Sequence, residues 1–133
     1  MTIHIQCQAR PEYLLVTMNG PWTTPAATQA LDAARLEADR QGQKRVLLDL
    51  RGLSKPDSEM VRFDSGRHLA AVFPSPFKVA AFANPDAINK FGETAAVNRF
   101  AHYRIFPEEH TAIQWLMAGF NKEEIKTTPN EMV

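Results

Sequence analysis

The chain has 133 residues and a mass of 14.9 kDa, which is enough for one domain with one hydrophobic core. Its 15 Lys and Arg residues balance its 15 Asp and Glu residues, so the overall charge favours neither nucleic acid nor an anionic membrane as a partner. The N-terminus lacks the pattern of a secretory signal, and no apolar stretch is long enough to span a bilayer. We therefore expect a cytoplasmic protein with no membrane span and no nucleic-acid partner.

The first predicted element is an edge strand over residues 3–9. Its residues alternate between two faces, with Ile3, Ile5, Cys7 and Ala9 on one and His4, Gln6 and Gln8 on the other. Such alternation is typical of a strand with one face in the core and one in water. Residues 10–12 leave room only for a hairpin, so we predict that this strand runs antiparallel to the next. The single cysteine excludes an internal disulfide, and its place in this strand predicts a buried thiol.

Four apolar runs follow, and each gives way to a loop with proline and then to a helix-like segment. The runs begin near Tyr13, Arg45, Phe77 and His102. Proline fits the first turn of a helix, because its missing N–H would have no partner there. Repeated strand–helix units predict crossover connections and parallel strands.

The burial pattern of these runs predicts which strands are central in the sheet and which one lies at its edge. Residues 14–16, 46–48 and 79–82 are continuously apolar, as strands covered on both faces require, whereas residues 102–106 alternate and predict the far edge. We therefore predict an α/β fold with a single mixed five-stranded sheet. It has an antiparallel N-terminal edge strand, four parallel strands in repeated β-α units and about four helices.

Most of the predicted helices carry a clear apolar stripe. In the first helix the stripe is formed by Ala27, Ala30, Leu31, Ala34 and Ala38, and Gly42 then ends the helix. The third and fourth helices show similar stripes over residues 88–95 and 112–120. Residues 121–133 lose the pattern, so we predict a single domain over residues 1–120 followed by a flexible C-terminal tail.

The predicted second helix, between Met60 and Phe73, is less regular. Gly66 in its middle costs about 1 kcal/mol relative to alanine, which suggests that something packs closely against it. We favour packing against the third helix near Gly92, and the alternative is a cleft in which a ligand or partner approaches the backbone. The helix also has more apolar residues than one narrow stripe needs. An exposed remainder would suit a protein partner, a second copy of the chain or a small apolar ligand.

Residues 46–58 are more specific than their fold class. An apolar strand ends near Asp49, a short turn follows, and Asp57-Ser58 opens a helix. This segment resembles the one by which STAS domains are recognised, including the bacterial anti-sigma-factor antagonists. The resemblance implies a STAS-like fold over residues 3–120 and a regulatory, protein-binding role in signalling.

The same resemblance implies that Asp57 caps the second helix and that Ser58 accepts a phosphate. The chain departs from the phospho-regulated antagonists directly afterwards, where Glu59 and Met60 replace a small residue and glycine. Asp49 is predicted to be a structural carboxylate that accepts hydrogen bonds from loop amides.

Two interpretations of Ser58 remain. The free N–H groups and dipole of a helix N-terminus stabilise an anion by about 0.3–1 kcal/mol, and Arg51 and Lys55 lie nearby in the sequence. Asp57 and Glu59 would repel the new charge. The default interpretation is that Asp57 or Ser58 caps the helix, which contributes about 1 kcal/mol.

A ligand or partner is expected at the C-terminal ends of the parallel strands, where helix N-termini also meet. The side chains predicted near that edge are Trp22, Ser54, Lys55, Asp57, Ser58, Asn84, Asp86 and Glu108. Trp22 has two equal interpretations: an exposed contact that anchors a partner, or a ring folded over the end of the core.

Catalytic patterns are not evident. Cys7 lies in an edge strand, the four histidines lack metal-ligand spacing, and no nucleophile elbow or phosphate-binding loop occurs. We therefore predict no enzyme, no metal site and no cofactor. Two hypotheses remain: a STAS-like module with a protein partner and Ser58-dependent affinity, or a small-molecule or lipid carrier. The second follows from the similarity of the STAS architecture to the lipid-binding SEC14 class, and predicts a cavity and a copurifying ligand.

Overall fold

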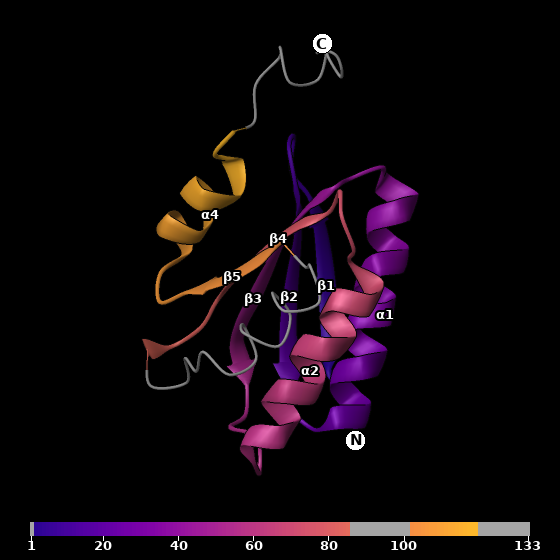
Figure 1. Cartoon of the computed structure of the whole chain (residues 1–133), viewed down its shortest axis with the longest axis vertical. Coiled ribbons are helices and arrows are strands. Elements are labelled where there is room, and N and C mark those ends of the chain that lie inside the picture. The colour runs from indigo at the N-terminus through magenta and orange to yellow at the C-terminus, as the bar shows by residue number, and fades with distance from the viewer. Residues whose placement is uncertain (1, 86–101, 120–133) are drawn as a thin grey trace.

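The computed structural model describes residues 2–85 and 102–119 (Figure 1). Its elements in chain order are β1 (His4–Ala9), β2 (Leu14–Gly20), α1 (Thr24–Gln41), β3 (Arg45–Leu53), α2 (Glu59–Val72), β4 (Lys78–Phe82), β5 (Tyr103–Phe106) and α4 (Glu109–Met117). The strands form one sheet in the order β1-β2-β3-β4-β5; β1 is antiparallel to β2, and the other neighbours are parallel. The predicted mixed α/β sheet is confirmed. The helix predicted over residues 88–95 and the tail predicted over residues 121–133 lie outside the described residues.

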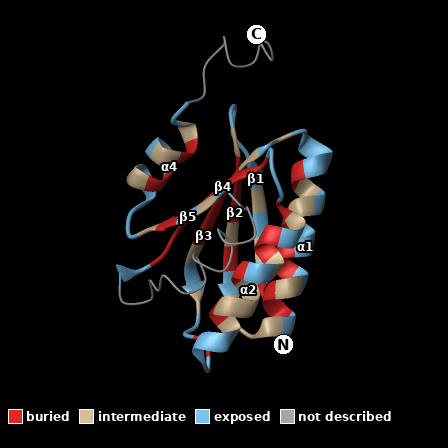
Figure 2. Ribbon diagram, in the orientation of Figure 1, coloured by how far each residue is buried: buried red, intermediate tan, exposed pale blue. Residues whose placement is uncertain are grey.

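The sheet separates two cores. In Figure 1, α1 and α2 lie side by side on one face of the sheet and α4 lies on the other. Successive residues of a strand point to opposite faces, so Leu14 and Val16 of β2 pack with α1 and α2, whereas Leu15 packs with α4. Figure 2 shows buried residues on the strands and on the helices that pack against them, and the inner strands β2, β3 and β4 hold continuous buried runs. The prediction that these apolar runs are covered on both faces is confirmed.

The N-terminal hairpin pairs β1 with β2 from His4 opposite Asn19 to Ala9 opposite Leu14. Ile5 and Cys7 are half-buried between exposed neighbours, as predicted, but Ala9 is exposed and the expectation of a buried Cys7 thiol is wrong. Cys7 is only half-buried because β1 is the edge strand, where core cover is incomplete.

Helix α1 begins and ends as its sequence predicts. The Thr23 hydroxyl accepts a hydrogen bond from the Ala26 N–H at 3.2 Å, and Pro25 lies in the first turn. Gly42 takes a left-handed conformation with φ 69° and donates its N–H to the last turn, which ends the helix. All five residues of the predicted apolar stripe are buried. Pro56 and Pro107, in contrast, precede α2 and α4 rather than lying in their first turns.

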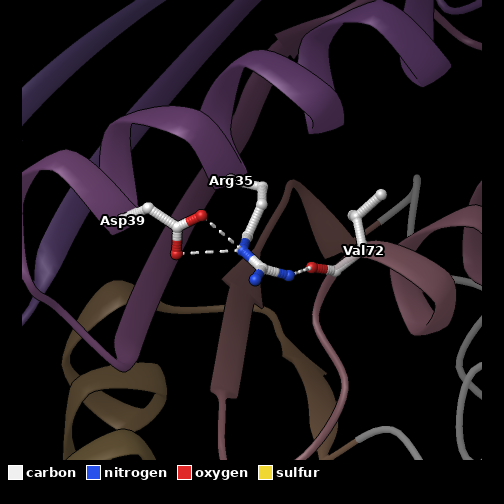
Figure 3. A network of polar contacts seen from close by, with 3 residues as sticks. All are labelled: Arg35, Asp39 and Val72. Carbon is white, nitrogen blue, oxygen red and sulfur yellow. Dashed lines mark hydrogen bonds and ion pairs between the residues drawn. The ribbon is translucent and has the colours of Figure 1, made fainter.

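Polar contacts hold α2 against α1 (Figure 3). The Arg35 guanidinium donates to the main-chain oxygen of Val72, the last residue of α2, and also binds the Asp39 carboxylate at 3.0 Å. Nearer the middle of both helices, His68 Nε2 lies 2.7 Å from Asp32 Oδ1. These polar contacts, together with the apolar packing, fix the position of α2 relative to α1.

Two strand cations hold the end of α4. Lys78 Nζ donates to the main-chain oxygens of Trp115 and Ala118, at 2.6 and 3.0 Å, and Arg45 Nε donates to that of Leu116 at 3.0 Å. Cations suit this position because the last carbonyl groups of a helix carry partial negative charge. The orientation of α4 on the sheet is therefore set by polar as well as apolar contacts.

Candidate functional site

Trp22 joins three segments at the C-terminal ends of β2 and β3. Its main-chain N–H donates to the Ser54 hydroxyl at 3.2 Å, and its indole N–H donates to the Ser65 hydroxyl of α2 at 3.1 Å. The Ser54 N–H donates to the Gly20 oxygen at 3.0 Å, which ties the two loops together. The half-buried indole ring packs against the core, so it is folded over the end of the core. Ser65, which the sequence analysis did not single out, holds the ring in place.

The topology places this site under α2 rather than in a crevice between strands. An α/β sheet has a binding crevice where its strand order reverses. Here the described strands lie in the sheet in the same order as in the chain, so no such reversal occurs among them. One space for a small molecule lies between α1, α2 and the sheet, and a second, open hollow lies between α1 and α2 beside Asp64 and His68.

A cavity of about 60 Å³ occupies part of the space between α1, α2 and the sheet. Residues from the sheet and both helices line it: Ile3, Met18, Trp22, Ala27, Leu31, Leu48, Leu50, Leu53, Arg62, Ser65, Gly66, Leu69, Tyr103 and Ile105. The buried Gly66 lies in the wall of this cavity, and both of its predicted roles, close helix packing and approach of a ligand or partner, stay predictions. Its predicted neighbour Gly92 lies outside the described residues.

Arg62 is the charged residue in this wall, and the sequence analysis did not single it out. Its side chain is only 8% exposed, and its Nη1 donates to the Glu59 carboxylate at 2.9 Å. The guanidinium carbon lies 5.5 Å from the centre of the Trp22 ring. A signal was present in the sequence, because Arg62, Gly66 and Leu69 lie at helical spacing on the buried face of α2.

Asp49 is on the other face of the sheet. It follows Leu47 by two residues and therefore points toward the side that α4 covers. Its carboxylate accepts hydrogen bonds from the Arg51 N–H at 3.1 Å and from the Arg51 guanidinium at 3.0 and 2.9 Å. Burial alone would raise the pKa of Asp49, but the hydrogen bonds and charge of Arg51 together outweigh it and lower that pKa. The prediction was that loop amides would donate these hydrogen bonds. The amide donor, Arg51, instead belongs to β3 itself.

Ser58 is the N-cap residue of α2, but its side chain makes no capping hydrogen bond. Its backbone is extended, with φ −150° and ψ 163°, and its main-chain oxygen accepts from the Val61 N–H at 3.2 Å. The default prediction of a side-chain cap is therefore wrong for Ser58, in contrast to Thr23 of α1. The hydroxyl is exposed, and the apolar side chain of Met60 two residues later is 54% exposed.

The other predicted edge residues are more dispersed. Lys55 and Asp57 are exposed between β3 and α2, Asn84 is exposed after β4, and Glu108 is exposed before α4. Within the described residues, no hydrogen bond or ion pair joins these four to Trp22, Ser54 or Ser65. Asp86 lies outside the described residues.

The described residues hold neither a metal-binding cluster nor a membrane-spanning helix. No group of three or more His, Cys, Asp or Glu side chains within residues 2–85 and 102–119 is arranged to hold a metal ion. No helix in this part of the chain is both long and apolar enough to cross a membrane.

Comparisons with known proteins identify the fold. No protein-family model and no curated protein matches the sequence. Among solved structures, an anti-sigma factor antagonist from Mycobacterium paratuberculosis has a TM-score of 0.58 and 16% identity, over 86% of this chain and 94% of the other. A DUF3478-family protein with a SpoIIAA-like fold from Shewanella loihica has a TM-score of 0.54 and 21% identity, over 86% and 94%.

A third structure, the anti-sigma factor antagonist SpoIIAA in its unphosphorylated form, has a TM-score of 0.52 and 15% identity. It is matched over 89% of this chain and 100% of its own length. The chain therefore has the SpoIIAA-like STAS fold that its sequence predicts.

Proposed function

We propose that this chain is a non-enzymatic regulatory module that binds a protein partner through the N-terminal end of α2, and that phosphorylation of Ser58 controls this binding. The observation that carries the proposal is the exposed Ser58 hydroxyl, which stands at the N-cap of α2 without making a capping bond. Two structures with this fold are anti-sigma factor antagonists, and one of them, SpoIIAA, was determined in its unphosphorylated form. A fold hosts many functions, so the argument depends on the site.

The charges around Ser58 decide whether a phosphate is tolerated there. Phosphoserine carries a charge of about −1.5 to −2 and is favoured by the free N–H groups of a helix N-terminus. Asp57 and Glu59 would oppose it, but Asp57 is exposed to water and the Glu59 carboxylate is paired with Arg62 at 2.9 Å. Arg51 is bound to Asp49, so we expect the exposed Lys55, three residues before Ser58, to meet the new charge.

Met60 gives this surface an apolar contact. Its side chain is 54% exposed and lies in the same first turn of α2 as Glu59. Exposed apolar side chains next to a regulated charge suit a protein interface, because a phosphate added beside them changes the desolvation cost of binding. We therefore place the partner over the α2 N-terminus.

The first experiment is intact-mass and peptide mass spectrometry of the protein isolated from its own host. The expected result is a phosphate that maps to Ser58 and is absent from the Ser58→Ala variant. Ser75→Ala is the matched control, because Ser75 is also exposed but lies beyond the other end of α2. A chain that is never phosphorylated at Ser58, in growth or under stress, would contradict the regulatory part of the proposal.

The second experiment tests the surface. Tagged wild type, Ser58→Glu and Met60→Asp are cross-linked in the host, and the proteins captured by each are compared. Leu36→Asp is the control, since Leu36 is 72% exposed but lies on α1. We expect one partner to be captured by wild type and the control and lost from Met60→Asp, with a changed yield for Ser58→Glu. A partner retained equally by all four would place binding elsewhere.

The lipid-carrier alternative receives less support from the cavity. A pocket for a drug-sized ligand has about 300–1,000 Å³, and a lipid needs at least as much. The cavity beside Arg62 has about 60 Å³. A smaller ligand is the remaining alternative for that space.

A further inference from the structure

The outer edge of β1 lacks the features that normally protect the edge of a sheet. Proteins shield such an edge with a short strand, charged side chains, a proline or a bulge. β1 is six residues long, pairs with β2 without a register shift, and contains no Lys, Arg, Asp, Glu or Pro. β5, at the opposite end of the described sheet, has four residues, of which Arg104 is charged and exposed, and Pro107 follows directly. Of these two strands, β1 is therefore the one suited to pairing with another strand.

The hydrogen bonds of the hairpin establish which main-chain groups of β1 point outward. The Arg10 N–H donates to the Tyr13 oxygen at 2.9 Å, so these two residues form a hydrogen-bonded pair. Bonded and non-bonded pairs alternate along an antiparallel ladder. Gln6 therefore bonds to β2, whereas the N–H and C=O groups of Ile5 and Cys7 point away from it. Among residues 2–85 and 102–119, no strand lies beyond β1 to pair with these outward groups.

The sequence of β1 is complementary to a second copy of itself. When two β1 strands pair antiparallel about Gln6, Ile5 of each copy lies opposite Cys7 of the other, and their outward groups exchange hydrogen bonds. The half-buried Ile5 and Cys7 side chains then meet on the face that α1 covers, and the exposed Gln6 amides meet on the other face. A symmetric interface needs such self-complementarity, because each copy presents the same surface.

Charge and proline select this register over the neighbouring one. If the two strands were centred on Cys7 instead, Arg10 of one copy would lie opposite His4 of the other, so that two basic side chains would meet. Pro11, which has no N–H to donate, would also enter the ladder. Centring the pair on Gln6 avoids both problems.

The faces of the sheet leave room for a second copy at this edge. On one face, α4 packs against β3, β4 and β5, and no residue of β1 belongs to that core. On the other face, α1 packs against β1 and β2. Partial burial raises the pKa of the Cys7 thiol and the charge of Glu37 raises it further, so Glu37 lies on the side of α1 near β1. Ala33, one turn before Glu37, is small and exposed, so this side of α1 admits the α1 helix of a second copy.

We infer that the outer edge of β1 is the interface of a symmetric homodimer, in which the β1 strands of two copies pair antiparallel about Gln6. The sheets of the two copies then form one continuous sheet. This interface does not include Ser58, so the inference does not depend on the proposed partner or on phosphorylation.

Cysteine cross-linking tests the pairing. Cys7→Ser removes the single cysteine of the chain, and Gln6→Cys or Gln8→Cys is added to it; both glutamines are exposed on the same face of β1. In the proposed dimer, position 6 lies opposite position 6 of the other copy in a non-hydrogen-bonded pair, where Cα atoms are about 4.5 Å apart and a disulfide can form. Position 8 lies opposite position 4, so its thiols do not meet.

We expect oxidation with copper phenanthroline to give at least about tenfold more disulfide-linked dimer from the Gln6→Cys chain than from the Gln8→Cys chain. Equal yields from the two chains, or no dimer from the Gln6→Cys chain, would overturn the proposed pairing.

Analytical ultracentrifugation of the full chain gives an independent measurement. We expect the apparent mass of wild type to rise with concentration toward twice the chain mass of 14.9 kDa. Gln6→Lys places two positive charges opposite each other, so it should weaken the dimer at least about tenfold. Gln114→Lys is the matched control, because Gln114 is exposed on α4, and it should associate as wild type does. A monomer at every concentration would overturn the inference, and so would a dimer that Gln6→Lys leaves unchanged.

Discussion

Arg35 of α1 donates a hydrogen bond to the main-chain oxygen of Val72, the last residue of α2 (Figure 3). The same guanidinium binds Asp39 and lies over the Phe77 ring, 4.6 Å from its centre. One side chain thus joins the end of α2, the middle of α1 and the segment that leads into β4. Since Ser58 is the N-cap residue of α2, this contact helps to position the proposed surface around Ser58.

Replacing Arg35 by alanine should therefore destabilise the fold. A hydrogen bond to a charged donor is worth about 1.5–3 kcal/mol, so we expect a loss of about that size in the free energy of unfolding, measured in urea. Arg40→Ala is the control on the same helix, because Arg40 is exposed and pairs with Glu37 one turn away. Similar stabilities of the two variants would show that Arg35 does not anchor α2.

A second prediction concerns Gly52, where β2 and β3 shift register. A Cβ added at Gly52 would lie 1.9 Å from the Asn19 side-chain oxygen and 2.7 Å from the Met18 main-chain oxygen. Gly52→Ala should therefore cost about 1–3 kcal/mol through overpacking. Adding Asn19→Ala should recover only part of this, because the contact with the Met18 backbone remains.

Gly42→Ala is the comparison for that experiment. A Cβ at Gly42 would meet nothing within 4 Å, but φ is 69°, so the expected cost is the backbone strain of about 1 kcal/mol or more. If the Asn19→Ala addition restored full stability to Gly52→Ala, the backbone contact would not matter.

The sequence predicted the sheet and α1 well because these elements repeat one simple pattern. The alanine stripe of α1 recurs at helical spacing, and the alternation of β1 and β5 identifies the two edges. These signals are local and come from burial alone. Predictions that depended on which side chains meet in space were less accurate.

Arg62 and Ser58 show why those predictions failed. A charged residue is usually solvated, so Arg62 did not suggest a buried face, although its spacing from Gly66 and Leu69 did. A serine before a helix usually caps it, but Ser58 leaves that bond unmade. Arg62 pairs with Glu59 one turn away and lies over the Trp22 ring, and the contact with Trp22 joins segments that are far apart in the sequence, so no local pattern encodes it.

A third prediction concerns the reactivity of Cys7. Partial burial raises the pKa of its thiol, the charge of Glu37 raises it further, and Arg40 opposes the shift. Iodoacetamide should therefore react with Cys7 at higher pH than with free cysteine, as a pH series of alkylation rates would show. Glu37→Gln should move the profile toward lower pH, whereas Glu12→Gln in the hairpin turn should not. An unchanged profile in Glu37→Gln would exclude the effect of Glu37.

The last prediction is a pH dependence that originates at His102. Burial lowers the pKa of His102, and the charges of Lys78 and Arg45 lower it further; its ring packs edge-on against Trp115 at 5.2 Å. The folded state therefore disfavours the protonated ring, while the unfolded chain takes up the proton near the ordinary pKa of 6.5. Stability should fall as the pH drops through that value.

Urea unfolding at about pH 7.5 and about pH 5.5 measures this change, because histidine titrates between them. We expect His102→Gln to lose less stability than wild type over this interval, since glutamine takes up no proton. Asp49 affects stability at lower pH than His102. Because the pKa of Asp49 is lowered in the folded state, its ionised carboxylate stabilises the fold above pH 3.8, the ordinary pKa of this group, and this stabilisation is lost as the pH falls further. An equal loss in wild type and His102→Gln would show that protonation of His102 does not oppose folding.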